Sequence, residues 1–167
     1  MIVSELRERL AEAIDKREIL LVYLFGSRAA ADAEPSRVGP MSDYDFGVLV
    51  ERALTPDERT NLQSRFASTV ARKLNTDRID VVVLNDAPVE LAYAVIAGGS
   101  VLFERDLATR VEYEAYVLGR YGDYLPILRE QRRQILEGGD YEKRVQRYRE
   151  ALGRTRRKIG EITSTTK

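Results

Sequence analysis

The fold of this chain is decided by residues 41–50, which read MSDYDFGVLV. The second half of this stretch is apolar apart from one glycine and predicts a buried β-strand, with Asp43 and Asp45 at its leading end. Side chains two positions apart on a strand point to the same face, about 6–7 Å from each other. Two carboxylates held that close repel each other unless a proton or a cation lies between them. Because oxygen ligands suit a hard divalent ion such as Mg²⁺, the pair predicts a metal site at the mouth of the strand.

The composition excludes several kinds of chemistry. The 167 residues include no Cys and no His. Disulfides, thiolate chemistry, histidine acid–base catalysis and the usual Cys/His zinc sites are therefore excluded. Lys plus Arg and Asp plus Glu each number 27, so no general attraction to nucleic acid or an acidic membrane is indicated. Catalysis must rest on carboxylates, hydroxyls, Lys or Arg side chains, or a bound metal.

The length of the chain fits one core with a helical appendage. Its first apolar run, residues 19–25, is too short to span a membrane, and no signal-peptide pattern precedes it. We therefore expect a cytoplasmic protein with no membrane contact.

The run at residues 19–25 predicts a central strand that is buried on both faces. It ends in Gly26-Ser27-Arg28, and helix-favouring alanines follow. A turn from a strand into a helix leaves backbone N–H groups free to bind an anion. Gly26 would allow a phosphate to approach, Ser27 could donate to it and Arg28 could add charge. An ordinary strand–helix turn is the commoner explanation of this pattern.

A third strand is predicted at residues 78–84, an apolar and β-branched run that contains one acid, Asp80. A carboxylate that enters a central strand is costly to bury without a partner. Pairing with a nearby Arg is the commoner explanation, but beside Asp43 and Asp45 it becomes a candidate third metal ligand.

Helical patterns fill most of the remaining core. A helix is predicted at residues 5–18, and another begins with a capping box formed by Thr55 and Glu58, with Pro56 at its first position. A short helix at residues 88–97 precedes a fourth strand at residues 100–104. Residues 32–42 lack periodicity and predict a surface loop.

From residue 106 onward the pattern is helical only. A long helix is predicted to residue 136, with a kink or break at Pro126. A last helix at residues 140–162 has a densely basic face. Such a face suggests nucleic-acid binding, but interspersed glutamates favour a solvated face or a seam for a partner helix, so we expect no direct nucleic-acid binding. The predicted organisation is a core at residues 1–105, a helical extension at 106–162 and a frayed tail at 163–167.

The ordered set of Gly26-Ser27, Asp43-x-Asp45 and Asp80 resembles the signature of the nucleotidyltransferase superfamily typified by DNA polymerase β. The sequences SDYDF at residues 42–46 and DVVVLNDAP at residues 80–88 are more similar still to the minimal nucleotidyltransferase (MNT) antitoxins, which are encoded beside HEPN-domain toxins. The resemblance implies an α/β (α+β) nucleotidyltransferase fold. In that fold a small mixed sheet is flanked by helices and followed by a C-terminal helical extension.

The resemblance also implies a chemistry. Asp43, Asp45 and Asp80 would bind Mg²⁺ and act in catalysis, and Gly26 and Ser27 would hold the β- and γ-phosphates of ATP. Two metal ions about 3.5–4 Å apart can activate an attacking hydroxyl and stabilise the departing pyrophosphate. Members of this group transfer AMP from ATP to a tyrosine hydroxyl of the cognate HEPN RNase toxin, which silences it. The implied partner is therefore such a toxin, in a hetero-oligomer.

The chain departs from the family pattern in one turn. Many relatives read Gly-Ser-x-Ala-Arg-Gly, whereas Ala30 and Ala31 stand in the last two places here. Arg28 or Arg37 is expected to take over the phosphate contact of the missing Arg.

Two alternatives stay open beside the toxin-directed adenylyltransferase. One is a nucleotidyltransferase for a small molecule such as an aminoglycoside, although only residues 106–167 follow the core to form a second substrate site. The other is a non-catalytic antitoxin that neutralises its toxin by binding, although Asp43 and Asp45 are both retained.

Overall fold

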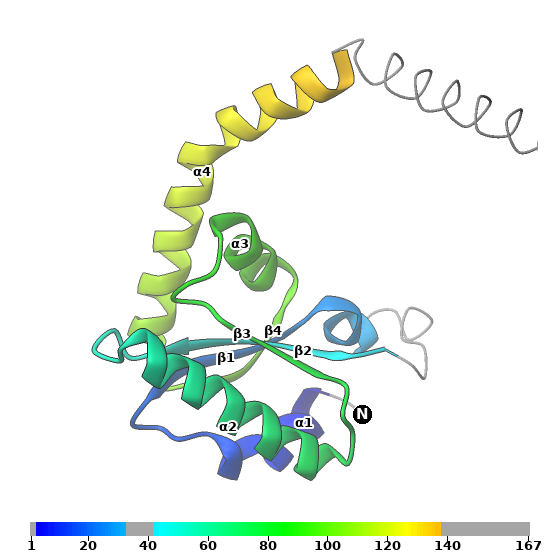
Figure 1. Ribbon diagram of the computed structural model, residues 1–167, viewed down its shortest axis with the longest axis vertical. Coiled ribbons are helices and arrows are strands. Elements are labelled where there is room, and N and C mark those ends of the chain that lie inside the picture. The colour runs from blue at the N-terminus through cyan, green and yellow to red at the C-terminus, as the bar shows by residue number, and fades with distance from the viewer. Residues whose placement is uncertain (1–2, 33–41, 138–167) are drawn as a thin grey trace, which may run out of the picture. The chain divides into compact units, whose positions relative to one another are not determined.

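The computed structural model describes residues 3–32 and 42–137, and within them four strands form one mixed sheet (Figure 1). The strand order is β3-β2-β1-β4. Strand β1 is antiparallel to both of its neighbours, whereas β2 and β3 run parallel. The strands are β1 (Ile19–Phe25), β2 (Tyr44–Val50), β3 (Ile79–Val83) and β4 (Ser100–Glu104). The predicted mixed sheet is confirmed.

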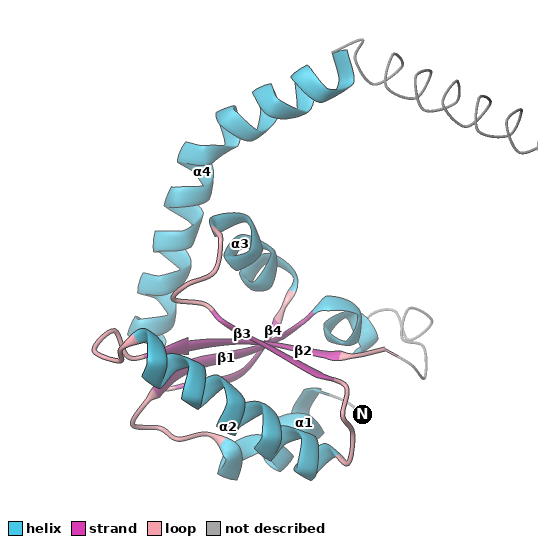
Figure 2. Ribbon diagram, viewed as in Figure 1, coloured by secondary structure: helices cyan, strands magenta, loops and turns pink. Residues whose placement is uncertain are grey.

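Helices cover both faces of this sheet (Figure 2). Helices α1 (Val3–Leu10) and α2 (Pro56–Leu74) lie on one side, and α3 (Val89–Gly98) and the start of α4 (Leu107–Glu137) lie on the other. The larger core cluster lies under α1 and α2 and includes Phe46 and Phe66. The smaller one, under α3, includes Tyr23 and Val95. The continuous apolar sequence of β1 is explained by this arrangement, because its residues are divided between the two clusters.

The capping box predicted for α2 is confirmed. The backbone N–H of Glu58 donates to the Thr55 hydroxyl at 3.3 Å, and the Glu58 carboxylate accepts from the Thr55 N–H at 2.7 Å. Pro56 occupies the first turn, where its missing N–H costs nothing. These contacts begin a helix whose buried residues Leu62, Phe66 and Val70 face the sheet.

The helix predicted at residues 5–18 is wrong in its length. Helix α1 ends at Leu10 and is followed by a short 3-10 turn, η1 (Ala11–Ala13). The cause is a second turn at Asp15, whose carbonyl accepts from the N–H groups of Glu18 and Ile19 at 3.1 and 2.8 Å. This turn leads the chain into β1, so the residues between η1 and β1 do not continue helix α1.

The chain divides into two compact units, residues 1–121 and 122–167. Helix α4 contributes residues to both and continues through Pro126, so a break there is wrong, and the alternative of a kink stays a prediction. The domain boundary predicted at residues 105 and 106 stays a prediction. The helix and tail predicted after residue 139, and most of the loop predicted at 32–42, lie outside the described residues. In the described ranges, no helix is both long and apolar enough to cross a membrane.

Candidate active site

The parallel pairing of β2 and β3 brings two of the predicted carboxylates together. Asp45 and Asp80 are direct register partners on the two strands. Asp80 is exposed, whereas Asp45 is partly buried. Because parallel strands begin at the same edge of a sheet, two acids near their starts meet there.

Asp43 lies just before β2 and not within it, so the prediction that it is a strand residue is wrong. The sheet hydrogen bonds begin one residue later, where the Tyr44 N–H donates to the Arg78 carbonyl at 3.0 Å. The Asp43 side chain is 53% exposed, and its Oδ1 lies 3.7 Å from Nη1 of Arg78. The orientation of Asp43 therefore does not follow from strand geometry.

Gly26 sits against the Asp45 carboxylate. Its φ is +70°, in the left-handed region, and a Cβ added to it would lie 2.2 Å from Oδ2 of Asp45. Phe25 pairs with Asp45 across β1 and β2, and this pairing brings Gly26, the next residue, beside Asp45. Gly26 thus makes room for a carboxylate, a requirement different from the phosphate approach that the sequence suggested. Ser27 follows it as an exposed residue at the start of a 3-10 helix, η2 (Gly26–Asp32).

The electrostatics of this edge favour a bound cation. Burial raises the pKa of the Asp45 carboxyl, and the charges of Asp80 and Asp43 raise it further. A divalent cation between these carboxylates would remove the repulsion that disfavours ionised Asp45. Mg²⁺ normally takes one or two protein carboxylates and completes its shell with water and substrate phosphates, and these residues fit that ligand set. No group of three acidic side chains in the described part of the chain is arranged to hold a metal as it stands.

Arg28 has protein partners in this structure. Its Nε and Nη2 donate to the Ser42 carbonyl at 2.8 and 2.6 Å. Its guanidinium lies 3.8 Å above the centre of the Tyr44 ring. As a phosphate contact Arg28 remains a prediction, and Arg37, the alternative, lies outside the described residues.

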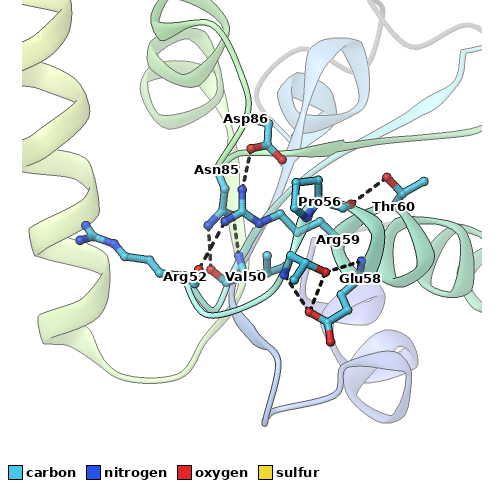
Figure 3. Close-up of polar contacts among 9 residues, drawn as sticks. Val50, Arg52, Pro56, Glu58, Arg59, Thr60, Asn85 and Asp86 are labelled. Atoms are coloured by element: carbon cyan, nitrogen blue, oxygen red, sulfur yellow. Dashed lines mark hydrogen bonds and ion pairs between the residues drawn. The ribbon is translucent and has the colours of Figure 1, made fainter.

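The far end of β2 is fixed by a residue to which sequence reasoning gave no role (Figure 3). Asn85 accepts from the Val50 N–H and donates to the Val50 carbonyl, both at 2.9 Å. Arg59 on α2 donates to Asp86 at 2.6 Å, next to Asn85 in the chain. In the sequence, the only signal of this contact is an Asn directly after the predicted strand at residues 78–84, because its partner is 35 residues away. These bonds hold α2, β2 and the β3–α3 loop together, at the end of β2 opposite Asp45.

This arrangement agrees with a known family. A family model described as polymerase beta, nucleotidyltransferase, matches residues 8–108. The chain belongs to the polymerase β nucleotidyltransferase family. The matched range includes all four strands and all of the predicted site residues. The carboxylate pair at the start of β2 and β3 is thus found in a nucleotidyltransferase domain.

Similar proteins fall in the same group. Protein adenylyltransferase MntA of Aphanizomenon flos-aquae (strain 2012/KM1/D3) is 33% identical over 113 residues, which is 61% of this chain and 69% of that protein. A crystal structure of a toxin–antitoxin with AMP-PNP has a TM-score of 0.56 at 24% identity, over 82% of this chain and 97% of that one. The toxin–antitoxin structure MntA–HepT has a TM-score of 0.51 at 24% identity, over 81% and 93% of the two chains. These two structures confirm the nucleotidyltransferase fold.

Proposed function

We propose that this protein is the antitoxin of a HEPN/MNT toxin–antitoxin pair and that it transfers AMP from ATP to a tyrosine hydroxyl of its toxin. The observation that carries the proposal is the register pairing of Asp45 with Asp80, with Asp43 close by, in a chain that is 33% identical over 113 residues to a protein adenylyltransferase. A chain in the solved complex of a tri-AMPylated Shewanella oneidensis HEPN toxin with an MNT antitoxin has the same fold, at a TM-score of 0.50 and 24% identity. The protein would work in the cytoplasm, where its ATP substrate is available.

The reaction needs few groups from the protein. The tyrosine oxygen attacks the α-phosphorus of ATP and forms a new P–O bond. The bond from that phosphorus to the bridging oxygen breaks, and pyrophosphate leaves. Asp80 is exposed on β3 and lies beside the other carboxylates, so it accepts the hydroxyl proton. Phosphoryl transfer depends mainly on positioning and charge stabilisation, so no His or Cys is required.

Asp43 and Asp45 would hold Mg²⁺ together with the nucleotide phosphates, and Asp80 would complete the carboxylate set. When bound, the metal stabilises the charge that develops on the leaving pyrophosphate. Gly26 lies next to Asp45, Ser27 follows Gly26 in the chain, and both are exposed. The Ser27 hydroxyl and nearby backbone N–H groups would therefore bind the β- and γ-phosphates.

The test is the intact mass of the toxin encoded beside this gene. The toxin is expressed with the wild-type chain, with Asp43→Ala/Asp45→Ala and with Asp123→Asn, a control at an exposed carboxylate on α4. We expect one or more added AMP units with the wild-type and control chains, and none with the double variant. A tight complex with no added mass at saturating ATP and Mg²⁺ would contradict the transferase and leave a binding antitoxin.

A further inference from the structure

We propose that Arg28 is a positioning residue that fixes Asp43 for metal binding, and not a ligand of the nucleotide phosphates. The proposal rests on the metal role of Asp43 and Asp45 given above. It starts from the position of Asp43 outside the hydrogen-bonded ladder of β2, which begins at Tyr44.

Arg28 contacts the residues on both sides of Asp43. The Ser42 carbonyl, which accepts two hydrogen bonds from Arg28, belongs to the peptide group that also contains the Asp43 N–H. The Tyr44 ring lies under the same guanidinium at 3.8 Å. A planar guanidinium can make both contacts at once because its donors lie in its plane and its face is free to stack. One side chain therefore contacts both neighbours of Asp43, whose own carboxylate lies 3.7 Å from Nη1 of Arg78.

The support for this contact reaches the hydrophobic core. The Tyr44 ring stacks on Phe46, with ring centres 6.2 Å apart, and Phe46 meets Phe66 of α2 edge to face at 5.8 Å. Phe46 is fully buried. Arg28 itself is partly buried and follows the tight turn at Gly26, whose Cα faces Asp45. The same turn thus places residues near both aspartates. Gly26 lies beside Asp45, and Arg28 contacts the two neighbours of Asp43.

The contacts that Arg28 already makes also limit its capacity to bind a phosphate. Two of its nitrogen atoms are already bonded to Ser42, and its face is covered by Tyr44. A phosphate that bound the Nε–Nη2 edge in a bidentate manner would have to displace the Ser42 carbonyl. Residues that orient metal ligands typically change metal affinity or activity by about 10–100-fold when they are removed.

The test measures metal and nucleotide binding separately in the full chain. Mn²⁺ is used in place of Mg²⁺, and its binding is measured by electron paramagnetic resonance with a non-hydrolysable ATP analogue present. Binding of the same analogue is also measured in EDTA. The variants are Arg28→Ala, Arg28→Lys, Tyr44→Leu and the Arg28→Ala/Tyr44→Leu double variant. Arg65→Ala is the matched control, because Arg65 is an exposed residue of α2 that, among the contacts described, bonds only Glu18.

We expect Arg28→Ala to weaken Mn²⁺ binding by about tenfold and to leave analogue binding in EDTA unchanged. Tyr44→Leu should weaken Mn²⁺ binding in the same direction, and the double variant no further than Arg28→Ala, because the two residues act as one unit. Arg28→Lys should restore part of the affinity, since an ammonium can bond Ser42 but cannot also stack as a plane. If Arg28→Ala does not fold, Arg28→Lys and Tyr44→Leu provide the same comparison.

The opposite result is a loss of analogue binding in EDTA, which would make Arg28 a phosphate ligand whatever the change in Mn²⁺ binding, because the analogue supplies part of the metal's ligand shell. Unchanged values in both assays would also overturn the proposal. If the wild-type chain binds no Mn²⁺, the metal role of Asp43 and Asp45 is wrong and this inference fails with it. None of these measurements needs the toxin, so failure of toxin modification is a separate result.

Discussion

Gly26 and Asp45 are in such close contact that a single added methyl group at Gly26 would occupy the position of the Asp45 carboxylate. The distance from an ideal Cβ to Oδ2 would be 2.2 Å, and the backbone at Gly26 has a φ of +70°. Gly26 directly follows β1 and Asp45 belongs to β2, and the pairing of Phe25 with Asp45 brings them together. The glycine and the carboxylate therefore form one structural unit.

Gly26→Ala is expected to cause a large loss of transferase activity and only a small loss of folding stability. The carboxylate is the end of a movable side chain, so it shifts and loses its position beside Asp80. A misplacement of about 1 Å can cost a factor of about 100 in rate. The left-handed backbone adds a cost of about 1–2 kcal/mol to folding. Toxin mass and urea unfolding measure the two effects.

Gly98→Ala is the matched control for that substitution. Gly98 ends α3, and a Cβ there would meet nothing within 4 Å. We expect full activity and an unfolding free energy equal to or slightly above that of the wild-type protein. Equal activity of the Gly26→Ala and wild-type chains would show that the carboxylate tolerates displacement.

Asp45→Asn is expected to stabilise the protein at neutral pH while it abolishes transfer. The folded-state pKa of Asp45 is raised by burial and by Asp80 and Asp43, above an unfolded value of about 3.9. The folded protein therefore binds the proton more readily, and its stability falls as pH rises from the unfolded pKa through the folded one. Asparagine removes this loss. Urea unfolding of both chains from acidic to neutral pH should show a smaller decline for the variant.

Mg²⁺ should reverse the difference in stability between the wild-type chain and Asp45→Asn. A ligand at 100 times its Kd stabilises the folded state by about 2.7 kcal/mol. We expect Mg²⁺ with an ATP analogue to raise the Tm of the wild-type chain and not that of Asp45→Asn. An equal rise in both chains would place the bound metal elsewhere.

Tyr23→Phe is expected to loosen the start of α4. Tyr23 lies buried in β1, and its hydroxyl donates to Oε1 of Glu114 on α4 at 2.8 Å. A hydrogen bond to a charged group contributes about 1.5–3 kcal/mol. The loss should appear in urea unfolding and as faster amide exchange in residues 107–118. Tyr116→Phe removes a hydroxyl of the same helix that accepts only an exposed hydrogen bond from Arg120 among the contacts described, and should leave both measurements close to wild type.

The sequence predicted those parts of the fold that depend on local patterns. Apolar runs gave β1 and β2, and the Thr55–Glu58 box gave the start of α2. The prediction that Asp43 is a strand residue was wrong because β2 begins at Tyr44. The N–H of Tyr44 donates to the carbonyl of Arg78, which lies 34 residues further along the chain. The close contact of Gly26 with Asp45 and the contact of Arg28 with Ser42 depend on strand register in the same way. Such contacts become visible only when the sheet is assembled.

Asn85→Ala is expected to lower stability without changing the chemistry of the site. The Asn85 side chain satisfies both backbone groups of Val50, at the end of β2 opposite Asp45 (Figure 3). Alanine leaves a donor and an acceptor unpaired in a partly buried position, each at a cost of about 1–3 kcal/mol when water cannot reach it. Because Asn85 is only partly buried, water can reach the space that it leaves, and we expect a total loss of about 2 kcal/mol in urea unfolding.

The activity of the folded Asn85→Ala chain should match wild type when it is assayed well below its Tm. Asn61→Ala, at an exposed position on α2, is the control for loss of an amide side chain and should change neither value. A loss of activity in folded Asn85→Ala would show that the far end of β2 influences Asp45. The strand would then transmit strain along its length, and Asn85 would belong to the support of the active site as well as to the support of the fold.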